Sequence, residues 1–177
     1  MSLLLLLAVL LVVLIVTVIL QPADFRIVRS TAIAAPPATV FAQVNDFHRW
    51  EAWSPWAKVD PTMKTTYEGA PAGTGAIYTW AGNGKVGAGR MTLVESGPPE
   101  LIRIKLEFLK PFAATNSTEF TFKAEGSRTV IEWSMRGRRN FLMKAMCLVL
   151  NMDKMVGGDF AKGLANLKTL SEAAAGK

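Results

Sequence analysis

The sequence has few of the side chains that catalysis and metal binding most often use. It contains a single cysteine, Cys147, and a single histidine, His48, among 177 residues. One cysteine excludes a disulfide framework within the chain, which suits a reducing compartment. One histidine, without a C-x-x-C or H-x-x-H pair or a set of neighbouring carboxylates, provides no metal-binding pattern. We therefore expect no metal site, a surface or capping role for His48, and an inert packed thiol at Cys147.

Signatures of hydrolases and nucleotide-binding proteins are also scarce. No G-x-S-x-G elbow presents a nucleophilic serine, although a Ser-His-Asp arrangement built from distant segments stays open. The segment Gly82-Asn83-Gly84-Lys85-Val86-Gly87 matches G-x-G-x-x-G, but a phosphate-binding loop must be followed by a helix. The next residues alternate as a strand does, and Asn-Gly is a hairpin signal. We predict a hairpin here and no cofactor.

Charge is absent from the first 21 residues. Leu3 to Leu20 form an unbroken apolar run in which sixteen of eighteen positions are Leu, Val or Ile. As a helix this run would span about 27 Å, close to the roughly 30 Å thickness of a bilayer's hydrocarbon core. We predict a transmembrane anchor helix over residues 2–21.

A cleaved signal peptide is the alternative to a retained anchor. No Lys or Arg precedes the apolar run, and no small-x-small pattern follows it. Both features are typical of signal peptides, so their absence favours a retained, single-pass anchor. Arg26 and Arg29 lie just after the run. The positive-inside rule then places the rest of the chain in the cytoplasm.

Residues 22–177 have the length of one folded domain, about 155 residues. All 34 charged side chains lie here, 20 basic and 14 acidic, for a net charge of +6. Such a surface would be attracted to anionic headgroups or acidic partners. No basic stripe with interleaved aromatic residues occurs, so nucleic acid is not an expected partner. Arg136, Arg138 and Arg139 are interpreted as solvated loop charge, with contact to anionic headgroups as the alternative.

Local patterns predict one strand, two short helices, six strands and a long helix. Phe25–Ile33 is the first strand, Thr39–Asn45 a short helix after Pro36-Pro37, and Asn45–Trp56 contains a second short helix that Pro55 ends. Alternation predicts the six further strands at Lys64–Glu68, Ala76–Ala81, Lys85–Glu95, Leu101–Leu109, Thr115–Ala124 and Thr129–Gly137.

Two of these strands alternate cleanly. Ile102, Ile104, Leu106 and Phe108 alternate with charged residues, and Thr129, Ile131, Trp133 and Met135 form the apolar set of the last strand. One apolar and one polar face predict an antiparallel sheet that is covered on one side.

The predicted cover of the sheet is a long helix over Asn140–Ala174, with Asn140 as its N-cap. Within it, Phe141–Leu150 is apolar nearly all round and needs a cover on most sides, which the sheet, a partner or lipid would provide. Gly157-Gly158 predicts a kink or a close approach to the sheet.

Trp50, Trp53 and Trp56 recur at intervals of three. The favoured interpretation is a structural plug that anchors the short helices. The alternatives are an aromatic wall at a ligand entrance or a belt at the bilayer interface.

Three stretches give the chain a family resemblance: APPATVF at 35–41, NDFHRWEAWSPW at 45–56 and MVGGDFAKGLANL at 155–167. With the order of elements, they resemble the START and Bet v 1-like helix-grip superfamily, also called SRPBCC or polyketide cyclase/dehydrase proteins, over residues 24–172. The resemblance implies an α+β helix-grip fold, in which a curved seven-stranded antiparallel sheet wraps a long C-terminal helix and leaves an apolar cavity. Its members bind lipids, sterols, quinones or hormones, cyclise polyketides, or assist chaperones.

We therefore expect a membrane-tethered domain that binds an apolar small molecule of the lipid, quinone or isoprenoid type. The short link after the anchor favours a ligand that is exchanged with the same membrane. The candidate pocket walls are Tyr78, Trp80, Ile104, Leu106, Phe108, Phe120, Phe122, Ile131, Trp133, Met135, Met155 and Phe160.

Two alternatives stay open at this stage. A cyclase or hydrolase would need acid–base groups in the cavity. Of the strand residues, only Tyr78 and Arg90 are candidates to face inward, because Glu107, Glu119 and Glu132 alternate with the apolar sets. An assembly or chaperone-activator partner would instead need a large exposed apolar patch.

Overall fold

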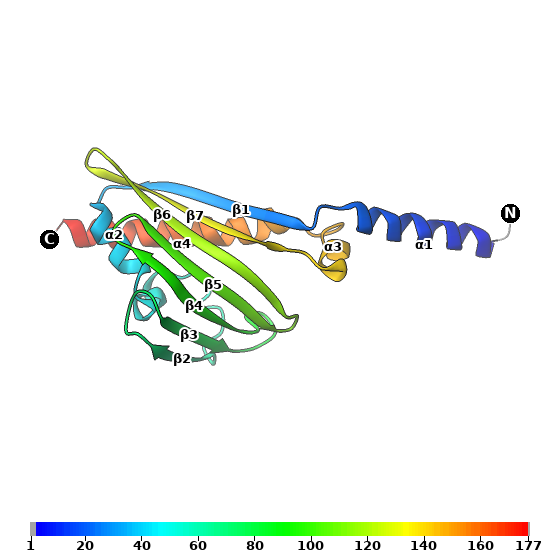
Figure 1. Ribbon diagram of the computed structural model, residues 1–177, viewed down its shortest axis with the longest axis horizontal. Coiled ribbons are helices and arrows are strands. Elements are labelled where there is room, and N and C mark those ends of the chain that lie inside the picture. Colours follow the sequence, from blue (N-terminus) through cyan, green and yellow to red (C-terminus); the bar gives the residue numbers. More distant parts are fainter. Residues whose placement is uncertain (1–2, 177) are drawn as a thin grey trace.

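The computed structural model describes residues 3–176 as an apolar N-terminal helix that projects from one end of an α+β domain (Figure 1). The elements, in chain order, are α1 (Leu3–Leu20), β1 (Asp24–Ile33), α2 (Pro37–Val44), the 3-10 helix η1 (Phe47–Ala52), β2 (Lys64–Gly69), β3 (Ala76–Ala81), β4 (Ala88–Gly97), β5 (Leu101–Lys110), β6 (Ala114–Glu125), β7 (Arg128–Arg138), α3 (Phe141–Met146) and α4 (Met152–Ala175).

The seven strands form one antiparallel sheet in the order β1-β7-β6-β5-β4-β3-β2. On β5, Ile102 and Ile104 are fully buried, whereas Arg103 on the opposite face pairs with Glu119 of β6 at 2.7 Å. Helix α4 packs along β1, on the apolar side of the sheet. The predicted helix-grip architecture, with one covered and one solvated face, is confirmed.

In the aromatic segment after α2, Trp50 and Trp53 form the plug that the spacing of the tryptophans predicted, whereas Trp56 is half-buried and lines a cavity, as in the alternative interpretation. The Trp53 side chain is 0% exposed, and Trp50 is also buried. Their indole N–H groups donate to the backbone carbonyls of Gln43 at 3.2 Å and Val44 at 2.9 Å. The helix that carries Trp50 is a 3-10 turn that ends before Pro55. Both indoles are therefore fixed to the end of α2.

The G-x-G-x-x-G segment is a hairpin turn, as predicted. The Gly87 N–H donates to the carbonyl of Asn83 at 2.8 Å, and Gly87 has a φ of +63°, a conformation that favours glycine. Because the turn extends to Gly87, β4 begins at Ala88 and not at Lys85.

The prediction of one continuous helix over Asn140–Ala174 is wrong. The chain forms two helices, and each begins at its own asparagine cap. The side-chain oxygen of Asn140 accepts the Met143 N–H at 2.8 Å, and that of Asn151 accepts the Lys154 N–H at 2.9 Å. A second cap inside the predicted helix is a start signal, and it separates α3 from α4.

The sheet does not cover α3 and the turn that follows it. Several large apolar side chains there are exposed, namely Phe141, Leu142, Leu148, Val149 and Leu150. Helix α3 contacts the end of α1, and the Lys144 Nζ donates to the Ile19 carbonyl at 3.1 Å. From the sequence, the sheet, a partner or lipid could each cover Phe141–Leu150. The sheet is excluded, because these side chains are exposed beside it.

Gly157 marks the close approach of α4 to β1. A Cβ at Gly157 would collide with the guanidinium of Arg29, which pairs with Asp153 at 3.0 Å, whereas a Cβ at Gly158 would meet nothing within 4 Å. The expected close approach is confirmed at Gly157.

This difference between neighbouring glycines gives a stability test. Gly158→Ala should stabilise the domain by about 1 kcal/mol, because alanine favours the helix. Gly157→Ala should gain nothing or destabilise, because its methyl group displaces Arg29 from Asp153. Thermal unfolding of the full chain in detergent, followed by tryptophan fluorescence, measures both. An equal gain for both variants would contradict the close packing of α4 on Arg29.

Candidate ligand cavity

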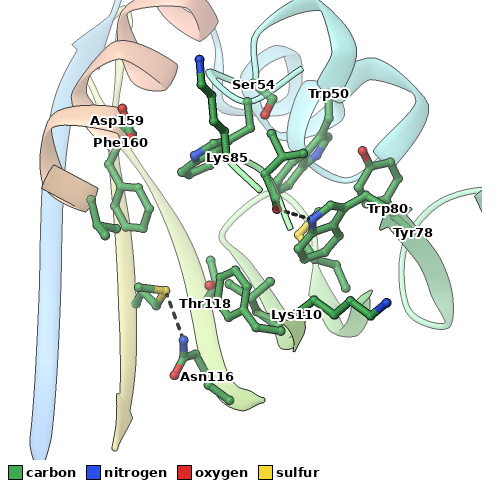
Figure 2. Close-up of a pocket in the computed structure, with 18 of the residues that line it drawn as sticks. Trp50, Ser54, Tyr78, Trp80, Lys85, Lys110, Asn116, Thr118, Asp159 and Phe160 are labelled. Carbon is green, nitrogen blue, oxygen red and sulfur yellow. Dashed lines mark hydrogen bonds between the residues drawn. The ribbon is translucent and has the colours of Figure 1, made fainter. Parts of the chain in front are cut away.

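A cavity of about 840 Å³ lies between the concave face of the sheet, the tryptophan plug and the first half of α4. Small-molecule sites in proteins commonly occupy about 300–1,000 Å³. Figure 2 shows side chains from several elements around this space, with Trp80 from β3, Thr118 from β6 and Phe160 from α4. The concave sheet supplies most of the wall, because alternate residues of each strand point the same way.

Seven of the twelve predicted wall residues line this cavity: Tyr78, Trp80, Leu106, Phe108, Trp133, Met135 and Phe160. Four others are packed in the core and do not reach it: Ile104, Phe120, Phe122 and Ile131. Phe122, for example, packs edge-on against Phe41 of α2 at 5.3 Å. The plug packs in front of Phe120, and α2 packs in front of Phe122.

Met155 lies outside the cavity and is 54% exposed. The face of α4 that lines the cavity carries Met152, Val156, Asp159 and Phe160. At 3.6 residues per turn, these residues span an arc of about 100° around the helix, and Met155 lies about 40° beyond its edge. The sequence placed Met155 in a helix but assigned it to the wrong face.

Sequence reasoning missed two groups of lining residues. Asn116 and Thr118 line the cavity from β6 and continue the alternation of Phe120 and Phe122, so the strand pattern contained their signal. The segment between η1 and β2 also contributes, with Ser54, Trp56, Ala57, Lys58, Asp60, Pro61 and Met63. No periodic pattern marks this irregular segment.

The apolar wall contains a few polar groups. Asn116 and Thr118 are both buried, and the Asn116 amide lies 3.8 Å from the Met135 sulfur (Figure 2). Within residues 3–176, the buried indole N–H of Trp133 has no hydrogen-bond partner. Its ring stacks on Phe160 at 4.0 Å. A buried donor without a partner costs about 1–3 kcal/mol, and this N–H is packed away from the open space of the cavity.

Tyr78 is the sequence-predicted titratable residue that lines the cavity. Burial raises its pKa to about 12, with smaller contributions from Tyr67 and Glu51. The hydroxyl group is therefore protonated at neutral pH and available as a donor. Arg90, by contrast, is exposed and is absent from the cavity wall.

The glutamates of the central strands lie on the convex face, as their alternation predicted. Glu132 pairs with Arg26 at 2.8 Å, Glu119 pairs with Arg103 at 2.7 Å, and Glu107 pairs with Lys105. These glutamates pair with basic side chains on the surface and do not line the cavity.

His48 and Cys147 also lie outside the cavity wall. The His48 ring stacks on Tyr67 at 4.1 Å, and its Nδ1 lies 2.9 Å from Asp46, which caps η1. His48 thus occupies the surface position expected for it. Within the described part of the chain, no three metal-ligating side chains gather in one place.

A comparison with protein families shows to which family this chain belongs. A family profile described as polyketide cyclase/dehydrase and lipid transport matches residues 24–172. The chain belongs to this polyketide cyclase/dehydrase and lipid transport family. The match covers the α+β domain from the start of β1 to the last turns of α4, which confirms the resemblance drawn from the sequence. A search of curated proteins gave no match.

Several solved structures share this fold. A protein from Chromobacterium violaceum is 17% identical, with a TM-score of 0.58 over 85% of this chain and 99% of its own. The Aha1 dimer from Colwellia psychrerythraea is 12% identical, with a TM-score of 0.59 over 84% and 96%. The di-domain ARO/CYC StfQ of the steffimycin biosynthetic pathway is 13% identical, with a TM-score of 0.63 over 88% of this chain and 53% of its own. At these identities the likeness is one of fold.

In this member of the family, the cavity lies toward the end of the domain that carries α1. The β3–β4 hairpin, the β5–β6 loop and the start of β1 meet at one end of the antiparallel sheet (Figure 1). All three line the cavity, through Val86, Phe112 and Phe25. Basic side chains accompany them: Lys85, Lys110, Arg138 and Arg139. The rim of the cavity is therefore basic and lies beside the apolar helix.

Asp60 fixes one edge of the cavity. Its buried carboxylate accepts the Asn83 N–H at 2.7 Å and the Thr62 N–H and hydroxyl at 2.9 and 2.7 Å. These bonds, that from Asn83 above all, lower the pKa of Asp60. The carboxylate joins the segment before β2 to the β3–β4 hairpin.

Replacing this carboxylate tests its role. Asp60→Asn should lower the melting temperature by several degrees at pH 7, because an amide offers one acceptor oxygen to three donors. The lowered folded-state pKa stabilises the fold above the unfolded-state value of about 3.9, and this stability is lost as the pH falls through the folded-state pKa. The gap to wild type should therefore narrow below pH 4.

Asp24→Asn is the matched control, because the Asp24 and Arg138 side chains are largely exposed in their 3.4 Å pair. It should melt like wild type. Equal effects of the two substitutions would contradict the assigned role of Asp60.

Proposed function

We propose that this chain is a membrane-tethered binding protein for an apolar small molecule of the lipid, quinone or isoprenoid type. The observation that carries the proposal is the cavity of about 840 Å³ with its aromatic and aliphatic lining. Every 100 Å² of apolar ligand surface buried there would contribute about 2.5 kcal/mol before the entropic costs of binding. Burial alone thus supplies enough free energy for specific binding.

The polar groups of the cavity narrow the ligand class. Tyr78 presents a hydroxyl donor that is protonated at neutral pH. A ligand with at least one carbonyl, hydroxyl or ether oxygen suits it better than a pure hydrocarbon. Quinones, fatty acyl chains and oxygenated isoprenoids meet this requirement.

Helix α1 supports the tethered part of the proposal. Within residues 3–176 it is the one helix long and apolar enough to span a bilayer. Only residues 21–23 separate it from β1, so the domain would stay against the headgroups and exchange its ligand with the same membrane. Arg26 and Arg29 follow soon after the last residue of α1 and favour a cytoplasmic position of the domain by the positive-inside rule.

Binding is better supported than catalysis. An acid–base reaction at neutral pH requires a group whose pKa lies near neutrality close to the substrate. Tyr78, with a pKa of about 12, would donate a hydrogen bond rather than act as a base. The strand glutamates are engaged on the convex face. Of the carboxylates in the cavity wall, Asp60 accepts three hydrogen bonds and Asp159 pairs with Lys162, so Glu51 is the carboxylate that a catalytic alternative would use.

Native mass spectrometry of residues 22–177 tests the proposal directly. This fragment keeps the whole core, because the buried cluster lies between Ile27 and Leu167. The protein, purified after contact with membranes, should carry one apolar molecule of lipid-like mass. Fragment that is free of ligand after such contact would contradict the proposal.

A pair of tryptophan substitutions locates the bound molecule. Met91 and Leu106 are cross-strand partners that line the cavity, and Thr92 and Lys105 are the next pair on the opposite face. The double variant M91W/L106W should lose the ligand, because two indoles occupy its space. The control T92W/K105W should retain it. Retention by both variants would place the ligand elsewhere.

Tyr78→Phe tests the polar contact. It keeps the ring stacked on Trp80 and removes the hydroxyl group, so affinity for an oxygen-containing ligand should fall about 2- to 10-fold. Trp56→Phe, which changes another aromatic residue of the lining, is the control and should have a smaller effect. Ligand titration with each variant measures the difference, and unchanged affinity for Tyr78→Phe would rule out a bond to this donor.

A further inference from the structure

An exposed apolar surface lies beside the cavity rim. Val149 is 85% exposed and Phe112, in the β5–β6 loop, is 47% exposed. Together they belong to a set that we name the apolar end surface, formed by Phe112, Phe141, Leu142, Leu148, Val149 and Leu150. Contiguous exposed apolar residues mark sites of contact with a partner or a membrane.

This surface lies at the carboxyl end of α1. Helix α3 contacts α1, and Lys144 donates to the carbonyl of Ile19, one residue before α1 ends. In Figure 1, α3 and the loop between β5 and β6 are at the end of the domain from which α1 projects. A helix that spans a bilayer leaves the hydrocarbon at its last residues, so α3 would be level with the headgroups.

The surrounding charges match a bilayer surface. Lys110 and Arg139 border Phe112 and α3, and Lys144 lies within α3. Each basic residue near an anionic membrane surface contributes about 1 kcal/mol of attraction. Apolar side chains bounded by basic residues are typical of segments that lie in the interfacial layer. A membrane therefore fits this surface better than a soluble protein partner.

We propose that the apolar end surface inserts into the interfacial layer of the membrane that holds α1 and so makes a second membrane contact. The inference rests on the proposed function only in that α1 spans the bilayer. Docking at this end turns the cavity rim, with Val86 and Phe112, toward the lipid. An apolar ligand would then enter the cavity from the membrane without crossing water.

Lipid quenching of single-cysteine labels tests this docking in the full chain. Cys147→Ser removes the one native thiol, and single cysteines then replace Val149, Phe112, Leu11 at the middle of α1, or Ser127. Ser127 is exposed in the β6–β7 hairpin, at the end of the sheet away from α1 (Figure 1). Each variant carries a bimane label in phosphatidylcholine–phosphatidylglycerol vesicles with brominated acyl chains.

Labels at positions 149 and 112 should be quenched at least 3-fold more than the label at 127, and the label at 11 should be quenched most. Quenching at 11 without quenching at 149 and 112 would overturn the docking and leave the tether intact. If position 149 is instead shielded from aqueous iodide but not quenched by lipid, a protein covers the surface, which also overturns the proposal. An unquenched label at 11 would refute the tether, and the docking with it.

Discussion

The packing of the tryptophan plug against the sheet determines the rest of this structure. Trp53 is fully buried and packs edge-on against Trp133 and Phe120 at 5.8 and 6.3 Å. It fills the space between the sheet and α4 at the end of the domain where α2 lies. Toward the other end, the cavity lies in front of the sheet. The same interaction therefore supplies much of the core and sets the inner limit of the ligand site.

Each central strand changes from core to cavity along its length. On β5, Ile102 and Ile104 are packed in the core, and Leu106 and Phe108 line the cavity. On β6 the core residue is Phe120, and Thr118 follows toward the cavity. All these residues share one face of the sheet, so their role depends on what packs in front of them.

The change from core to cavity within each strand explains which wall residues the sequence could predict. Alternation on β5 and β7 was sufficient to predict the sheet, its covered face and part of the wall, because strand periodicity is local. Alternation could not distinguish the core residue Ile104 from the cavity residue Leu106, because that difference depends on which residues, distant in sequence, pack in front of the strand. The prediction that Met155 lines the cavity is wrong for a similar reason. The rotation of α4 about its axis depends on its packing at Gly157 against Arg29. Asn151 could have been predicted as the N-cap of a second helix, but the apolar run of Phe141–Leu150 favoured one long helix.

The cavity, the basic rim and the apolar helix all lie toward one end of the domain, which gives the proposed function its physical coherence. An apolar ligand gains most when its site opens where that ligand is dissolved, and the rim beside α1 meets this condition. The decisive measurement is an experimental structure of residues 22–177 purified with its native ligand. The account predicts one elongated molecule in the cavity, with an oxygen within hydrogen-bonding distance of the Tyr78 hydroxyl group. A cavity closed by the side chains of Leu106, Phe108 and Met135, with no room for a ligand, would contradict it.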